Sequence, residues 1–132
     1  MTSLIFDALT LTGTGGGDRL TALLPVGYEL RGLGGDDTLT GGRGKDRLHG
    51  GSGDDILDGN DERDELYGGD GGDRLHGGND RDMLDGGLGV DTAYGGNGND
   101  LIFAGDGDTA YGGNGNDQVV VAGAPASVDG GA

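Results

Sequence analysis

Aspartate recurs every nine residues along most of this 132-residue chain. Ten aspartates share one position of a repeating unit: Asp37, Asp46, Asp55, Asp64, Asp73, Asp82, Asp91, Asp100, Asp108 and Asp117. Carboxylates and the carbonyls of glycine-rich turns are hard oxygen donors, which suit Ca²⁺, whereas Mg²⁺ demands a tighter octahedron. The chain has no Cys, and His49 and His76 lie outside the turns, so zinc and copper fit poorly. The spacing therefore indicates rows of calcium sites.

The unit that carries these aspartates has glycine at positions one, two and four, Asp at six and an aliphatic residue at eight. Nine-residue units begin at Gly32, Gly41, Gly50, Gly59, Gly68, Gly77, Gly86 and Gly95, a unit of eight begins at Ala104, and a unit of nine begins at Gly112. Glycine allows positive φ or close backbone approach, which predicts a turn at positions one to six. Positions seven to nine predict a short strand in which only position eight faces inward.

Two units make one coil of eighteen residues, and stacked coils give two parallel sheets over a thin aliphatic core. The fold class is therefore all-β, a parallel β-roll. Aspartates eighteen residues apart then stack along each edge. At a strand spacing of ~4.8 Å, two carboxylates repel by roughly 3–4 kcal/mol at an effective dielectric of ~20, so a cation is needed between them. Five turns on each edge leave eight gaps, and eight Ca²⁺ would offset the net charge of -16.

The composition excludes several other classes of protein. Aromatic residues make up 5% of the chain and Gly accounts for 35 residues, so a thick globular core is not expected. The 24 acidic residues against 8 basic ones argue against a nucleic-acid partner, which requires a basic surface. The first seven residues do not resemble a Sec signal peptide, and no run approaches the ~20 apolar residues of a transmembrane helix.

The repeat weakens toward both ends. We interpret residues 1–31 as an N-terminal cap with degenerate repeats, because 13–21 is a recognisable unit and 23–31 keeps only Leu30 of the pattern. Residues 32–120 are the predicted roll, and 121–132 are a C-terminal tail. Residues 128–132 look like a further unit cut short, which indicates a longer parent protein.

These units resemble the RTX (repeats-in-toxin) family of calcium-binding nonapeptide repeats. The resemblance covers 32–120 strongly and 13–31 weakly. It implies a right-handed β-roll with calcium between successive coils. It also implies a secreted bacterial protein that leaves by type I secretion and folds in external calcium. The module would then stabilise a larger extracellular protein or aid its secretion.

The resemblance also implies main-chain ligands at the first four positions of the unit. Those at position one are Gly50, Gly59, Gly68, Gly77, Gly86, Gly95, Ala104 and Gly112. Those at position two are Leu33, Gly42, Gly51, Asn60, Gly69, Gly78, Gly87 and Gly96. Those at position three are Ser52, Asp61, Asp70, Asn79, Leu88, Asn97, Asp106 and Asn114. Those at position four are Gly35, Gly44, Gly53, Glu62, Gly71, Asp80, Gly89 and Gly98.

Some units depart from the pattern. Glu62 replaces a position-four glycine, which predicts backbone strain. Asp80 also replaces a position-four glycine, but Asp tolerates the left-handed conformation better, and Leu33 replaces a position-two glycine. The eight-residue unit at Ala104 should have a distorted turn. We therefore expect the sites near Glu62 and Asp108 to be the weakest, and no ninth site between Asp18 and Asp37.

Two further sets of side chains allow two interpretations each. Lys45, Arg63 and Arg81 stack on one edge, where they balance the Asp charge or bind an anionic polysaccharide. His76, Tyr94 and Tyr111 stack on one outer face, with Tyr67 and Phe103 on the other. These rings either support the thin coils by cross-strand packing or bind sugars or a neighbouring domain of the parent protein.

We expect no catalytic residues, because the aspartates are explained by metal and neither His has an evident nucleophile partner. The leading hypothesis is a calcium-dependent module of a secreted bacterial protein that binds about eight Ca²⁺. The alternative is a carbohydrate-binding or adhesive module that uses the basic strip or the aromatic column.

Overall fold

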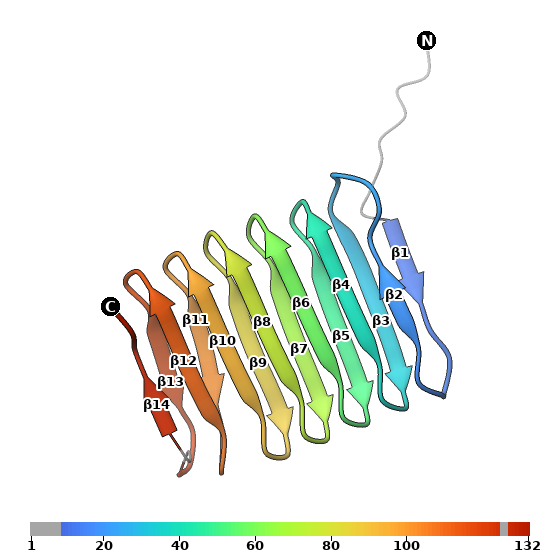
Figure 1. Ribbon diagram of the computed structural model, residues 1–132. Coiled ribbons are helices and arrows are strands. Elements are labelled where there is room, and N and C mark those ends of the chain that lie inside the picture. Colours follow the sequence, from blue (N-terminus) through green and yellow to red (C-terminus); the bar gives the residue numbers. More distant parts are fainter. Residues whose placement is uncertain (1–8, 125–126) are drawn as a thin grey trace.

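The computed structural model describes residues 9–124 and 127–132. Two parallel seven-stranded sheets face each other and are joined by turns along two edges (Figure 1). The first sheet has the order β1 (Leu9–Thr12), β3 (Tyr28–Gly34), β5 (Arg47–Ser52), β7 (Glu65–Asp70), β9 (Met83–Leu88), β11 (Leu101–Ala104) and β13 (Gln118–Val121). The second sheet has the order β14 (Ser127–Asp129), β12 (Thr109–Asn114), β10 (Thr92–Asn97), β8 (Arg74–Asn79), β6 (Ile56–Asp61), β4 (Thr38–Arg43) and β2 (Arg19–Thr21).

The register of the sheets confirms the coil of eighteen residues. Leu48 pairs with Leu66 between β5 and β7. The offset falls to seventeen where the eight-residue unit intervenes, as between Ala93 and Ala110. Consecutive strands therefore alternate between the two sheets, and the predicted all-β parallel β-roll is confirmed.

Position-eight side chains form the core between the sheets. Seven leucines and one isoleucine at this position are completely buried: Leu30, Leu39, Leu48, Leu57, Leu66, Leu75, Leu84 and Ile102. Ala93 and Ala110 continue the row toward the C-terminal end, where the core becomes thinner. Because each coil contributes only two such side chains, the apolar core supplies a modest driving force for folding.

The strands are longer than the sequence predicted. Positions seven to nine were expected to form the strand, but most strands continue through positions one to three of the next unit. In β5 and β7, for example, Gly51 pairs with Gly69 and Ser52 with Asp70. The pairing skips position one and resumes at position two, and a glycine at position one has no side chain to collide with the interior. The turn itself is therefore limited to positions four to six.

The terminal segments continue the same architecture. Strands β1 and β2 pair with β3 and β4, and β14 pairs with β12. Residues 1–8 of the predicted cap and residues 125–126 of the predicted tail lie outside the described residues. The boundaries at 31/32 and 120/121 stay predictions. Within 9–124 and 127–132, no helix has the length and apolar character needed to cross a membrane.

Candidate metal centre

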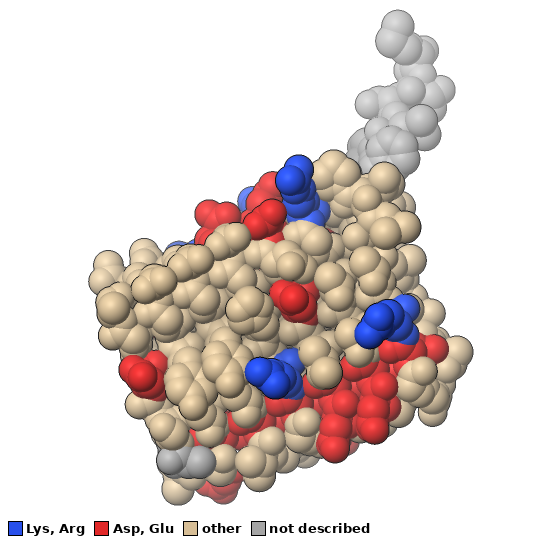
Figure 2. Space-filling model, in the orientation of Figure 1, with Lys and Arg blue, Asp and Glu red and all other residues tan. Residues whose placement is uncertain are grey.

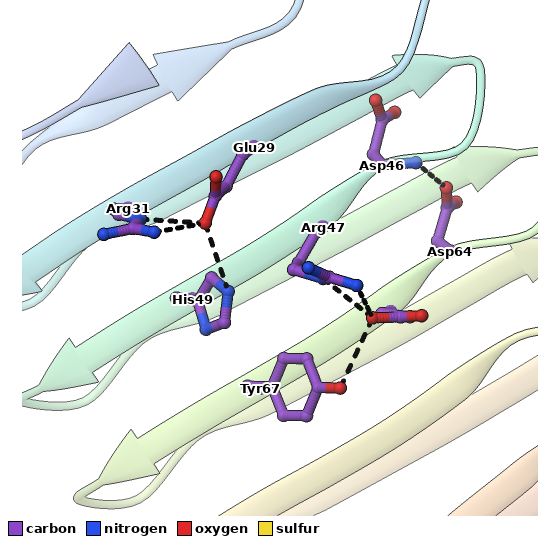
Figure 3. A network of polar contacts seen from close by, with 8 residues as sticks. Glu29, Arg31, Asp46, Arg47, His49, Asp64 and Tyr67 are labelled. Atoms are coloured by element: carbon purple, nitrogen blue, oxygen red, sulfur yellow. Dashed lines mark hydrogen bonds and ion pairs between the residues drawn. The ribbon is translucent and has the colours of Figure 1, made fainter. Parts of the chain in front are cut away.

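The position-six aspartates line the inside of both edges of the roll. The nine from Asp37 to Asp108 are at most 3% exposed, and Asp117 is half-buried. In each rung, the backbone N–H of one Asp donates to Oδ1 of the Asp in the following coil at 2.7–2.9 Å. Figure 3 shows the rung from Asp46 to Asp64. Eight such rungs, four on each edge, give two continuous ladders.

The second carboxylate oxygen of these aspartates has a different environment. Within the described part of the chain, this buried Oδ2 atom has no hydrogen-bond partner in nine of the ten residues: Asp37, Asp46, Asp55, Asp64, Asp73, Asp82, Asp91, Asp100 and Asp117. An unpaired buried carboxylate oxygen is unfavourable. A repeated row of them is the signature expected of ligands to a cation.

Backbone carbonyls converge on the same gaps between coils. A Cβ added at Gly50 would meet Oδ2 of Asp55 and, at 2.6 Å, the carbonyl oxygen of Gly68 in the next coil. Added Cβ atoms at Gly69 and Gly71 would collide with the carbonyl oxygens of Gly51 and Gly53. A position-one carbonyl thus lies near a free carboxylate oxygen, and the carbonyls of positions two and four lie close to the next coil. Oxygen donors of this kind fit Ca²⁺ better than a nitrogen- or sulfur-seeking metal.

Burial sets the ionisation of the ladder in the absence of a cation. Desolvation raises the pKa of Asp64 to about 8 and that of Asp82 to about 7, although a backbone N–H donor opposes the shift. The same cause raises the pKa of Asp46 and of Asp73 to about 6. Neighbouring carboxylates add to the rise along the stack. The ladder therefore resists carrying its full negative charge unless a cation compensates for it.

No three His, Cys, Asp or Glu side chains converge on a single point among the residues that the structure describes. Two position-six carboxylates border each gap between coils. The main-chain ligands that the resemblance implied stay a prediction.

Comparison with protein families identifies the repeat. The family model of the RTX calcium-binding nonapeptide repeat, which spans four copies, matches residues 29–57, 49–84, 58–93, 76–108 and 85–119. The chain belongs to this RTX family. Comparisons with curated proteins and with solved structures find no match.

One RTX unit departs from the ladder as the sequence predicted. In the eight-residue unit, Oδ2 of Asp108 accepts a hydrogen bond from the Gly105 N–H at 2.6 Å. Strand β11 stops at Ala104, so positions two and three of this unit do not pair with strand β9, as they do in the other coils. In this unit the shortened turn gives Oδ2 of the position-six aspartate a hydrogen-bond partner, whereas the same atom has none in the other nine units.

Among the residues that the structure describes, four non-glycine residues adopt the left-handed conformation that RTX turns require. Their φ angles are 82° at Leu33, 79° at Asn60, 75° at Glu62 and 75° at Asp80. Strain was predicted at Glu62, and Leu33 and Asp80 were identified as departures from the glycine pattern. Asn60 was missed, although its place at position two of the unit was a sufficient signal.

The N-terminal ends of the two ladders differ from each other. On one edge, Asp18 donates its N–H to Oδ1 of Asp37 at 2.7 Å, but its own Oδ2 accepts from the N–H and hydroxyl of Thr14. On the other edge, the N–H of Tyr28 donates to Asp46 and no carboxylate precedes it. Neither end repeats the pair of free Oδ2 atoms that seven of the eight gaps have, the exception being the gap between Asp91 and Asp108.

The fold brings the side chains of the basic strip together. Lys45, Arg63 and Arg81 line one shallow groove of about 290 Å³ with Glu62 and Asp80. The two acidic side chains in this groove offset part of the positive charge of the three basic side chains. The binding of an anionic polysaccharide to the basic strip stays a prediction.

The aromatic columns pack on themselves. Tyr94 and Tyr111 stack at 4.9 Å between ring centroids with an interplanar angle of 7°, and Arg74 lies over the Tyr94 ring at 5.6 Å. On the other sheet, His49 stacks on Tyr67 at 5.0 Å, beside the Arg47–Glu65 ion pair (Figure 3). One face of Tyr67, Tyr94 and Tyr111 is thus used within the roll, which supports the cross-strand packing interpretation for these rings, whereas Phe103 stays exposed.

The sequence reasoning missed a second side-chain ladder on one edge. Asn79 donates to Oδ1 of Asp61 at 2.9 Å, Asn97 donates to Asn79 at 2.9 Å, and Asn114 donates to Asn97 at 2.8 Å. All four residues occupy position three of their units. The recurrence of Asn at that position was the available signal.

Proposed function

We propose that this RTX chain is a calcium-binding module that folds on binding about eight Ca²⁺. The observation that carries the proposal is the row of buried Oδ2 atoms without partners on both edges. The family match supports calcium as the ion. Eight rungs, and hence eight gaps, match the charge of -16 that eight divalent cations would offset.

Each proposed site lies between two turns of successive coils. One representative site combines the carbonyls of Gly51 and Gly53 and the carboxylate of Asp55 with the next turn, which adds the carbonyls of Gly68 and Asp70 and the carboxylate of Asp73. The free Oδ2 atoms of both aspartates support this set. The bound ion supplies positive charge between two carboxylates that otherwise repel.

Folding and binding are coupled in this account. A chain that folds without calcium must bury carboxylates without partners, and that burial costs several kcal/mol for each ionised group. The unfolded chain cannot present the same ligands in one place. The free energy of calcium binding therefore becomes free energy of folding.

The biological role that we propose follows from this coupling. Extracellular calcium modules typically bind with dissociation constants of about 10⁻⁴ to 10⁻³ M, so the chain stays unfolded in the cytosol and folds outside the cell. Such a module stabilises a larger secreted bacterial protein, or aids its type I secretion, without catalysis of its own.

Calcium titration of the purified chain, followed by equilibrium dialysis and by far-UV circular dichroism, tests the proposal. We expect about eight bound ions and a folding midpoint of about 10⁻⁴ to 10⁻³ M. Binding of only one or two ions, or a midpoint in the submicromolar range, would contradict it.

A further inference from the structure

The loop between β2 and β3, residues 22–27, carries a cluster of exposed apolar side chains (Figure 1). Leu23 is 85% exposed, Leu24 is 54% exposed and Val26 is 42% exposed. Leu23 is the most exposed large apolar side chain in the described part of the chain. Single exposed apolar residues are ordinary, but several together indicate a surface that another molecule covers.

Neither calcium binding nor the core accounts for these side chains. The unit of residues 23–31 has Tyr28 at position six, so its turn has no carboxylate to offer a cation. The N–H of Tyr28 still donates to Oδ1 of Asp46 at 2.6 Å, which continues the pattern of the ladder. Leu30 fills the core position of this unit and is completely buried. The apolar residues of the loop are thus additional to what the roll requires.

Hydrogen bonds at both ends hold the loop in one conformation. The N–H of Ala22 donates to the carbonyl of Thr40 at 2.8 Å, and Ala22 itself is buried. The N–H of Val26 donates to the carbonyl of Leu24 at 2.9 Å, which closes a tight turn around Pro25. The ring of Pro25 restricts the backbone further. A preorganised loop loses little conformational entropy when its side chains become buried against a partner.

The next turn along this edge places cations beside the apolar loop. An added Cβ at Gly44 would lie 2.6 Å from the carbonyl carbon of Val26, so the turn and the loop are in contact. Arg43 and the loop line one open groove of about 470 Å³. The Arg43 side chain is 78% exposed, although Asp61 lies 3.8 Å from it. Lys45 in the same turn is exposed as well. Two cations therefore flank the apolar side chains.

The opposite edge of the roll has a different character. Acidic side chains gather along the edge at the bottom of the view in Figure 2, and Asp36, Asp54 and Asp70 are exposed there. This edge also has exposed apolar side chains, since Leu88 is 72% exposed and Val90 is 68% exposed. The turn that carries Leu88 and Val90 contains no cation. An anionic surface would thus attract the loop edge and repel the opposite edge.

The size of the apolar cluster favours a lipid surface over a folded protein. Three exposed apolar side chains on one loop provide far less than the about 1,000 Å² that a specific protein interface buries. A lipid surface surrounds a projecting side chain without a complementary groove. Attachment to it increases with the buried apolar area and with attraction to anionic headgroups. Cations close to the surface add to that attraction.

We propose that this loop attaches the folded roll to anionic lipid surfaces. Leu23, Leu24 and Val26 enter the boundary between headgroups and acyl chains, and Arg43 and Lys45 contact lipid phosphates. The long apolar stems of these two cations lie along the boundary while their charged ends stay hydrated. This attachment goes beyond calcium binding and uses none of the aspartate ladder.

Flotation of the calcium-loaded full-length chain with lipid vesicles tests the proposal. The vesicles contain phosphatidylcholine and phosphatidylglycerol in equal parts, and calcium is the same in every sample. We expect the parent to bind and the double change Leu23→Ser with Leu24→Ser to weaken binding at least about tenfold. Leu88→Ser with Val90→Ser removes the same kind of side chain from the acidic edge, and its binding should match that of the parent.

A second pair of changes tests the cations. Arg43→Gln with Lys45→Gln should weaken binding to the mixed vesicles by about tenfold. On vesicles of phosphatidylcholine alone, the same pair should bind as the parent does. Circular dichroism in calcium should match the parent for every variant, because all the changed side chains are exposed and lie outside the ladders.

Three results would overturn the assignment. One is a parent chain that does not bind the mixed vesicles. Another is equal binding of the parent and the Leu23→Ser, Leu24→Ser chain, since calcium would then bridge the acidic edge to the lipid. The third is a dimer without vesicles that these two serine changes dissociate, because the loop would then be covered by a second copy of the chain. Each of these leaves the number of bound calcium ions, and hence the proposed function, unaffected.

Discussion

Each position-six aspartate uses its two carboxylate oxygens differently. Oδ1 accepts a backbone N–H from the preceding coil, and this bond fixes the carboxylate in the turn. Oδ2 remains free in every one of them except Asp108. Asn at this position would place a neutral amide there, and Glu would be too long for the Oδ1 bond. The geometry thus accounts for Asp at ten successive units.

Removing one aspartate should affect two sites, because each residue inside the ladder borders two gaps. Asp73 lies between Asp55 and Asp91. We expect Asp73→Ala to lose about two of the eight ions and to raise the calcium concentration at the folding midpoint. Asp85→Ala, which removes the same charge from an outer strand face, should behave like the parent. If calcium titration of Asp73→Ala matched the parent, the register of the ladder would be wrong.

The turn is the element that decides where calcium can bind. Glycines at positions two and four adopt positive φ, whereas position one is glycine for a different reason. An added Cβ at Gly68 would lie 2.5 Å from the carbonyl oxygen of Gly86 and 2.8 Å from Cβ of Asp73. Position one therefore keeps open the space that the ion needs.

Two glycines of one repeat unit provide a matched test of this requirement. Gly68→Ala should destabilise the calcium-loaded roll by about 3 kcal/mol, because its methyl group enters a fully occupied gap. At Gly72 an added Cβ comes no closer than 3.4 Å to any atom, so Gly72→Ala should change stability by less than about 1 kcal/mol. Thermal unfolding in calcium measures both. Equal effects of the two changes would refute the special role of position one.

The sequence predicted the repeating features of these elements better than their limits. The nine-residue period alone placed Leu48 in the core and Asp46 in an edge ladder, because residues at the same position of a repeat occupy equivalent places in successive coils. The extension of β5 to Ser52 was missed, because it depends on how closely Gly50 approaches the next coil. The hydrogen bond between Asp108 and Gly105 depends on the shortened turn, whose exact path a period cannot specify.

At the scale of the whole molecule, charge and burial oppose each other. The chain carries a formal charge of -16, and nine of its aspartates are buried in two ladders. Further acidic side chains gather on the surface along the lower edge of the view in Figure 2. The apolar core is a single row of side chains in each sheet, so it has little capacity to offset this repulsion. Protons or cations must therefore supply the compensating charge.

The metal-free chain should respond to pH in a defined direction. Burial holds the pKa of Asp64 at about 8 and that of Asp82 at about 7 in the roll, above the value of about 3.9 in an unfolded chain. A pKa that is raised on folding gives stability that is complete below about pH 4 and is lost as pH rises through the folded value. In metal-free buffer, circular dichroism should thus show more roll at pH 5 than at pH 8. More structure at pH 8 would contradict the burial of neutral carboxyls.

The central claim is that calcium between the aspartate ladders is a condition of folding. Far-UV circular dichroism of the chain at neutral pH, first in EDTA and then in excess millimolar calcium, tests it most directly. The account predicts the spectrum of an unfolded chain in EDTA and a β-sheet spectrum after calcium is added. A β-sheet spectrum in EDTA that calcium leaves unchanged would contradict it.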